Sequence, residues 1–200
     1  MTTTRRRLPQ EESRRAALDA ARLLLIEAGP QAVTLKAVAG RIDRTHANLL
    51  HHFGSAAGLQ MALAEHLAGT VCATVAEAAR ARLEGKATPR QIVDLTFDSF
   101  DREGGGALAS WMLLSGNENA LDPIVEAIHR MIDELYPQEL AEGAPRTMHE
   151  TTLALTLMAL GDALMGDRLA ASLGVSRATV RDKAVAMLVA SYVEAGVAGD

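Results

Sequence analysis

The sequence has few cysteines and few aromatic side chains. Its 200 residues include a single cysteine, Cys72, so no disulfide bond can form within the chain. Aromatic residues make up only 3%, whereas hydrophobic residues, among which alanine and leucine dominate, make up 48%. This composition favours helices over strands and is apolar enough to bury a sizeable core. We therefore expect an all-α protein.

A long uninterrupted apolar segment and a signal peptide are also missing. Asp162, Asp167 and Arg168 interrupt the most apolar segment, which is too short to cross a membrane. The first residues are basic and lead into an amphipathic pattern rather than an apolar core. We expect a cytoplasmic protein with no membrane partner.

Residue types that carry catalysis or bind metals are present but are not grouped. His46 and His51 are five residues apart, not the four that place two ligands on one helix face. The glycines at 104–106 are not followed by Lys-Ser or Lys-Thr, so they do not predict a phosphate loop. Cys72 lies among apolar residues and is interpreted as a small core residue. We expect no catalytic residue, metal or cofactor, and an all-α enzyme is the less favoured alternative.

Charge is distributed unequally along the chain. Residues 1–56 contain nine Lys/Arg and five Asp/Glu, whereas residues 57–200 contain eleven and twenty, so the two parts have net charges of +4 and −9. Three histidines, His46, His51 and His52, add hydrogen-bond donors to the basic part. A basic segment of this kind can bind an anion such as a phosphate backbone.

The basic part shows the pattern of three helices after a mobile arm at residues 1–9. Apolar residues recur on one helix face from 17 to 28, before Gly29 and Pro30 end the helix. A second helix is predicted at 34–42 with Thr34 as its cap, and a third at 45–52 with Leu49 turned inward. The third is too short to be stable alone, so packing against its neighbours must hold it in place.

The sequence HHFGS at 51–55 follows two leucines, about 20 residues after the Gly-Pro pair. With the helix pattern before it, this arrangement resembles the TetR family of bacterial transcriptional regulators, closely over about the first 65 residues and afterwards only in helical character and length. The resemblance implies a three-helix DNA-binding domain with a helix-turn-helix at 1–54, and a larger helical effector-binding and dimerisation domain at 55–200, with about nine helices in all. It implies a repressor that binds a palindromic double-stranded DNA operator as a homodimer and is released by an unknown small-molecule effector.

Residues for DNA contact follow from this arrangement. A helix N-terminus favours phosphate, and the third helix offers hydrogen-bonding and apolar groups to base edges. The predicted DNA-binding residues are Thr34, Lys36, Arg44, Thr45, His46, Ala47, Asn48, Leu50, His51 and His52.

Four positions depart from the pattern that the family commonly shows. Ala37, Asp43, Leu50 and Ala56 stand where an acidic residue, glycine, tyrosine and lysine are frequent. The changes at Leu50 and Ala56 remove contacts to bases and phosphates. The alternative function is therefore a ligand-binding helical dimer with weak or lost DNA binding.

Helices are also predicted at 55–83, 89–101, 107–115 and 122–136, and the first of them joins the N-terminal part to the rest. The large side chains of this region are interpreted first as core packing and second as the lining of a cavity for an apolar ligand. The candidate pocket residues are His66, Phe97, Phe100, Trp111, Met112, Asn117 and Met158.

The last two predicted helices, 148–169 and 176–195, are apolar on more than one face. Such helices need cover on two sides, which a second copy in a two-fold four-helix bundle would provide. The predicted dimer interface is formed by Leu153, Leu157, Leu160, Leu164, Val185, Leu188 and Tyr192.

Residues 169–185 contain a competing motif, LAASLGVSRATVRDKAV, which looks like the helix-turn-helix of other regulator families. Its position between the two predicted dimer helices argues against DNA contact there, as does the more complete N-terminal arrangement. Arg177, Arg181 and Lys183 are then expected to be solvated ends of a dimer helix.

Overall fold

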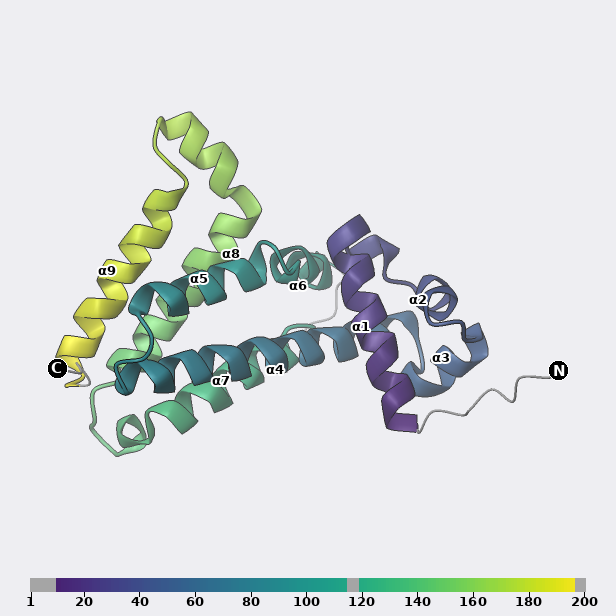
Figure 1. The fold of residues 1–200 in the computed structure, drawn as a ribbon, viewed down its shortest axis with the longest axis horizontal. Helices are drawn as coiled ribbons and strands as arrows, with labels where there is room; N and C mark the ends of the chain where they lie inside the picture. The colour runs from purple at the N-terminus through teal and green to yellow at the C-terminus, as the bar shows by residue number, and fades with distance from the viewer. Residues whose placement is uncertain (1–9, 115–118, 197–200) are drawn as a thin grey trace.

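The computed structural model describes residues 10–114 and 119–196, and all regular secondary structure in these ranges is helical (Figure 1). The elements are α1 (Gln10–Ala28), η1 (Pro30–Ala32), α2 (Leu35–Arg41), α3 (His46–Phe53), α4 (Ala56–Leu83), α5 (Pro89–Phe100), α6 (Gly105–Leu114), α7 (Asp122–Leu135), η2 (Pro137–Leu140), α8 (Thr147–Leu173) and α9 (Ala178–Glu194). The all-α prediction is confirmed. The predicted arm at 1–9 lies outside the described residues.

The helices agree with their predicted bounds to within two residues, except at the end of α8. Helix α8 runs four residues beyond the predicted end and stops at Gly174, which adopts a left-handed conformation with φ 67°. Helix α6 begins at Gly105, two residues before its predicted start and inside the glycine run at 104–106. Close packing explains the glycine at 106, because an added Cβ there would lie 3.0 Å from the Cβ of Ala163.

Helices α1–α3 form a head at one end of the molecule, and the long helix α4 extends from it into the body (Figure 1). In the body, α4 packs against α5 and α7, and α5 packs against α8 and α9. Helices α8 and α9 also pack against each other. No helix among residues 10–114 and 119–196 combines the length and apolarity needed to cross a membrane.

Two hydrophobic cores lie along α4. The first joins the head helices to the start of α4 and to α6, and it includes Leu49, Leu63 and Leu108. The second lies in the body and includes Val75 and Phe97. Because α4 contributes to both cores, a movement of the body can reach the head through this helix.

Candidate DNA-binding surface and ligand pocket

Two threonines cap the helices of the helix-turn-helix. The Oγ1 atom of Thr34 accepts a hydrogen bond from the backbone N–H of Ala37 at 3.2 Å, as the sequence predicts. The Oγ1 atom of Thr45 accepts one from the N–H of Asn48, also at 3.2 Å. Between the helices, Asp43 has a φ of 52°, a left-handed conformation that non-glycine residues rarely adopt. These features set the angle between α2 and α3.

One face of α3 is buried in the head, and the residues on its opposite face are exposed to solvent. Leu49 is fully buried and Phe53 nearly so, and both belong to the head core. The predicted DNA-binding residues that lie exposed on the head are Thr34, Lys36, Thr45, His46, Ala47, Leu50 and His51, and Arg44 is partly exposed.

Asn48 and His52 are less available than the other predicted residues. The Oδ1 atom of Asn48 is shielded from solvent and has no hydrogen-bond partner among the described residues. His52 is partly buried, and its backbone carbonyl accepts a hydrogen bond from Arg14 of α1. Burial lowers the pKa of His52, and the neighbouring His51 and Arg14 lower it further. His52 is therefore neutral at pH 7 and adds no charge to the surface.

The junction between α3 and α4 depends on two glycines. Gly54 ends α3 with a φ of 72°, and Ser55 caps α4 by accepting from the N–H of Gly58 at 2.9 Å. A Cβ atom added to Gly58 would lie 2.0 Å from the backbone oxygen of Phe53. Gly58 thus permits the close approach of the two helices, a role that the sequence analysis missed.

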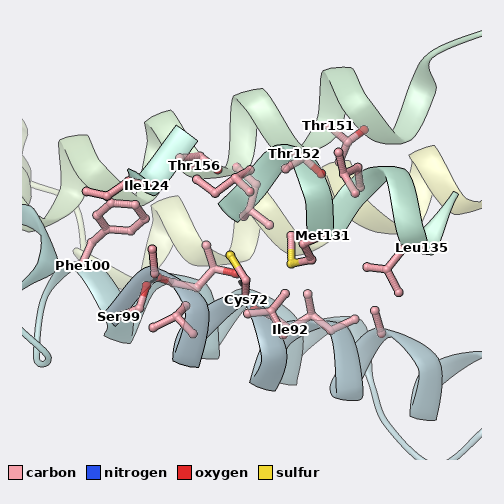
Figure 2. A pocket seen from close by; sticks show the side chains of 18 of the residues that line it. Cys72, Ile92, Ser99, Phe100, Ile124, Met131, Leu135, Thr151, Thr152 and Thr156 are labelled. Carbon is pink, nitrogen blue, oxygen red and sulfur yellow. Dashed lines mark hydrogen bonds between the residues drawn. The ribbon is translucent and has the colours of Figure 1, made fainter. Parts of the chain in front are cut away.

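A cavity of about 110 Å³ lies in the body between α4, α5, α7 and α8, and residues of α6 and α9 complete its lining (Figure 2). Its walls are mainly aliphatic, and their polar groups are hydroxyls and one thiol. The thiol belongs to Cys72, which is buried, as predicted for a small core residue, and which also forms part of the cavity wall. Burial raises the pKa of Cys72 to about 11, although Arg130 opposes the shift.

Only one of the predicted pocket residues, Phe100, lines this cavity. Trp111 and Met112 pack in the first core, because α6 contacts η1 of the head and α4 there. Phe97 is fully buried in the second core, where the guanidinium of Arg181 lies 5.1 Å from its ring centroid. Met158 packs against the same core. Asn117 lies outside the described residues.

His66 lines a different cavity, of about 560 Å³, between α1 of the head and helices α4 and α5. Its Nε2 atom lies 3.6 Å from Oδ1 of Asp19. In the same cavity Arg22 forms an ion pair with Glu103, which connects α1 to the segment before α6. His66 therefore lies at the contact between head and body, not in the apolar cavity.

The predicted dimer residues divide into two groups. Leu153, Leu157 and Leu164 of α8 are 62%, 57% and 52% exposed, and Leu160 and Val185 are partly exposed. The prediction was wrong for Leu188 and Tyr192, which are 3% and 2% exposed and pack in the second core. These two residues lie on the face of α9 that covers α5 and α8, so a second copy cannot reach them.

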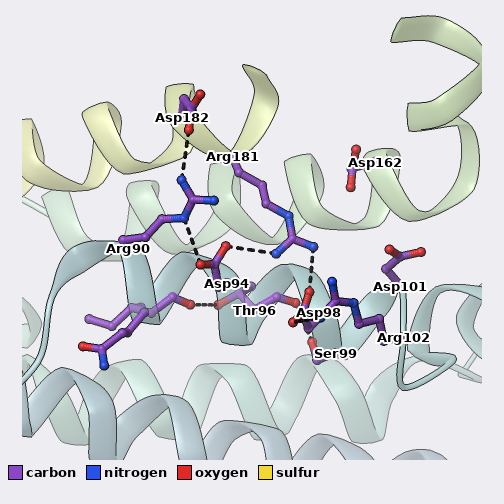
Figure 3. A network of polar contacts seen from close by, with 12 residues as sticks. Arg90, Asp94, Thr96, Asp98, Ser99, Asp101, Arg102, Asp162, Arg181 and Asp182 are labelled. Atoms are coloured by element: carbon purple, nitrogen blue, oxygen red, sulfur yellow. Dashed lines mark hydrogen bonds and ion pairs between the residues drawn. The ribbon is translucent and has the colours of Figure 1, made fainter. Parts of the chain in front are cut away.

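The arginines of the competing motif form ion pairs within the body, and Figure 3 shows those of Arg181. Arg177 donates from Nε and Nη2 to the two carboxylate oxygens of Asp162, each at 2.9 Å. Arg181 bridges Asp94 at 3.0 Å and Asp98 at 2.7 Å. The prediction that these arginines are solvated was wrong, whereas Lys183 is exposed. Neither arginine is available to a DNA phosphate.

Among the described residues, no three His, Cys, Asp or Glu side chains are grouped as a metal site would require.

The sequence model of the family described as "Bacterial regulatory proteins, tetR family" matches residues 17–63. No curated protein matches the chain in sequence. Among solved structures, multidrug binding protein EbrR complexed with imidazole is 19% identical with a TM-score of 0.59, over 87% of this chain and 93% of that one. EbrR complexed with ethidium is 16% identical with a TM-score of 0.61, over 90% and 99%. The putative regulatory protein SCO4313 is 14% identical with a TM-score of 0.55, over 90% and 97%.

These solved structures are less than 20% identical to this chain, so they establish its fold alone, over 87% to 90% of its length. The sequence match covers α2, α3 and most of α1, and it describes regulatory proteins rather than enzymes. The chain therefore carries the N-terminal domain of the TetR family of bacterial regulatory proteins, as its sequence predicts, on an all-α body with the fold of its structural neighbours.

Proposed function

We propose that this protein is a transcriptional repressor that binds a palindromic operator as a homodimer and leaves it when a small molecule binds the body. The observation that carries the proposal is the exposed face of α3. This face presents Thr45, His46, Ala47, Leu50 and His51 while Leu49 is buried beneath it.

The chemistry of this face suits the major groove. Thr45 and the two histidines can form hydrogen bonds with base edges, Ala47 permits close approach, and Leu50 can contact a thymine methyl group. Lys36 is exposed in the first turn of α2, where free backbone N–H groups also favour a phosphate. Residues 1–54 thus supply both positioning contacts and base contacts.

A second copy would cover the exposed leucines of α8. Leu153 and Leu157 lie four residues apart and Leu157 and Leu164 lie seven apart, so the three form one stripe along the helix. Pairing two such stripes around a two-fold axis would bring two α3 helices to two half-sites, about 34 Å apart for one turn of DNA. The proposed dimer therefore explains both the apolar stripe and a palindromic operator.

The proposed coupling between ligand and DNA uses α6 together with α4. Gly105 and Leu108 of α6 line the body cavity, and Leu108 also belongs to the first core. Ala64 and Leu67 of α4 have the same double role. A ligand that changes the packing of these residues shifts the head relative to the body. The difference between the ligand's affinities for the DNA-binding arrangement and for the other arrangement sets how far DNA binding weakens.

DNA binding can be tested with purified protein and labelled DNA from the region upstream of its gene. We expect fluorescence anisotropy to show specific binding that weakens steeply with salt, because phosphate contacts release counterions. Ala47→Glu should abolish specific binding, because it places a carboxylate at the DNA surface. Ala178→Glu is the matched control, since Ala178 is equally exposed but lies in the competing motif.

Two results would contradict the proposal. Absence of binding by the unmodified protein at low salt would favour a ligand-binding dimer that has lost its operator. Loss of binding in Ala178→Glu with full binding in Ala47→Glu would assign DNA recognition to residues 169–185.

A further inference from the structure

The described lining of the body cavity contains no charged side chain. Arg82 lies near one end of the cavity but does not line it, and its guanidinium stacks over the ring of Tyr192, 3.8 Å from the ring centroid. Tyr136 and Tyr192 are themselves neutral, because burial raises the pKa of both hydroxyls. A charged ligand would lose its water without gaining a counter-charge from these walls, so the cavity favours an uncharged ligand.

The cavity is long and narrow. Along α7 its lining extends from Ile124 to Tyr136, which corresponds to about 18 Å at the rise of an α-helix. A volume of about 110 Å³ spread over such a length forms a narrow channel rather than a round chamber. Figure 2 shows Phe100 and Ile124 near one end of this channel and Leu135 near the other. Compact ring systems are too wide for it.

Two hydroxyl groups in the wall are available to a ligand. Thr152 and Thr156 lie one turn apart on α8 and both line the cavity (Figure 2). Neither hydroxyl has a hydrogen-bond partner among the described residues, whereas that of Thr151 donates to the backbone oxygen of Thr147 at 2.7 Å. The hydroxyl of Thr96 likewise donates a hydrogen bond to the backbone oxygen of Ile92 at 2.9 Å. The free pair lies between the two ends of the channel and can bind one polar group.

We infer that the effector is an uncharged molecule with a linear aliphatic chain and a single hydrogen-bonding group, such as an alcohol, ketone or ester, which Thr152 and Thr156 bind. The inference rests on the proposed function only in naming this ligand as the effector. Binding itself can be measured without DNA.

Four ten-carbon compounds test the charge and the shape of the ligand separately. Isothermal titration of the full-length protein at pH 7.5 would compare 1-decanol with decanoate, decylammonium and 1-adamantanol. We expect 1-decanol to bind about tenfold or more tightly than each of the others, since a charge or a wider body is disfavoured. Equal or tighter binding of either ion would overturn the assignment of charge, and equal binding of 1-adamantanol would overturn the linear shape.

Cys72 can report where the ligand binds, because it is the single cysteine of the chain and lines the cavity. Its modification by methyl methanethiosulfonate should be slow at pH 7 and faster at pH 9, since the thiolate is the reactive form. We expect saturating 1-decanol to slow the reaction at pH 9 by about tenfold. Binding of 1-decanol without protection of Cys72 would place the ligand elsewhere.

The role of the two threonines requires its own variants. Thr152→Val combined with Thr156→Val should weaken 1-decanol binding roughly threefold to tenfold through the lost hydrogen bond. Replacement of both by serine should retain the affinity, and Thr179→Val, at an exposed site on α9, should not change it. Thermal unfolding checks that each variant is folded. Unchanged affinity in the folded valine variant would exclude these hydroxyls from the site.

DNA binding without ligand separates this inference from the proposed function. If the protein binds DNA but not 1-decanol, the ligand assignment fails and the repressor proposal stands. If it binds 1-decanol and not DNA, the ligand assignment stands and the repressor proposal fails.

Discussion

Gly58 shows how a single residue can determine the orientation of the recognition helix. It has no side chain at the point where α4 begins against the end of α3, and any Cβ there would overlap the backbone oxygen of Phe53. The atom that would have to move is part of the backbone, so the two helices would have to separate. The angle of α3 therefore depends on the absence of one methyl group.

We predict that Gly58→Ala destabilises the protein by about 1–3 kcal/mol, the usual cost of overpacking, and weakens DNA binding further by reorienting α3. Urea unfolding and fluorescence anisotropy measure the two effects. Gly69→Ala is the control in the same helix, because an added Cβ there meets nothing within 4 Å. It should be neutral or stabilise α4 by about 0.5–1 kcal/mol. Equal effects of the two substitutions would show that the contact with Phe53 is unimportant.

At the scale of elements, a cluster of charged side chains with little exposure to solvent holds α7, η2 and α8 together at the corner where the three meet. Glu139 of η2 accepts hydrogen bonds from the backbone N–H groups of Met148 and His149, at 3.0 and 3.3 Å, and so caps α8. The ring of His149 contacts Glu139 through Nδ1 at 2.8 Å and Asp133 of α7 through Nε2 at 2.9 Å. Burial disfavours the charged ring, but these two hydrogen bonds outweigh it and raise the pKa of His149.

This shift predicts how the stability of the corner depends on pH. The folded state raises the pKa of His149. Its contribution to the free energy of unfolding is therefore fully present below about pH 6.5, and it is lost as the pH rises through the pKa of the folded state. His149→Gln should therefore lower the urea midpoint more at pH 6 than at pH 9. Glu139, whose pKa is lowered by these hydrogen bonds against the effect of burial, is ionised at both values.

His129→Gln provides the control, since His129 contacts the same Asp133 at 3.3 Å but its side chain is 67% exposed. It should change the midpoint little at either pH, as expected for an exposed ion pair. If His149→Gln lowered the urea midpoint by the same amount at pH 6 and pH 9, this would contradict the prediction that the protonated ring of His149 stabilises the corner.

At the scale of the whole molecule, the exposed stripe of α8 determines whether the proposed dimer can form. We predict that Leu157→Glu makes the protein monomeric in sedimentation at micromolar concentration, because the new carboxylate would be buried without a partner. DNA binding should weaken roughly 100-fold or more, as each head would then bind alone.

Val125→Glu is the matched control on α7, where Val125 is 59% exposed, similar to the 57% of Leu157. This variant should sediment and bind DNA as the unmodified protein does. A dimer that persists in Leu157→Glu but dissociates in Val125→Glu would place the interface on α7.

The sequence by itself determined the helices and the composition of the head. Thr34 at a helix start, Gly29 before Pro30 and the inward position of Leu49 are local signals, which act within one or two turns of helix. A helix as short as α3 has one buried stripe, so the residues on its opposite face could be named without coordinates. His52 and Asn48 were harder to place, because tertiary packing reduces their exposure: Arg14 of α1 donates to the backbone carbonyl of His52, and Oδ1 of Asn48 is shielded from solvent.

Only the tertiary structure decided the roles of the body residues. Periodicity predicts that a residue is apolar and faces a neighbour, but it does not identify that neighbour. Tyr192 and Leu157 therefore looked alike in sequence, although one is buried within the chain and the other is exposed. The cavity depends on incomplete packing among the six helices α4 to α9, so Cys72 and Thr152 became part of one wall only when distant segments of the chain came together.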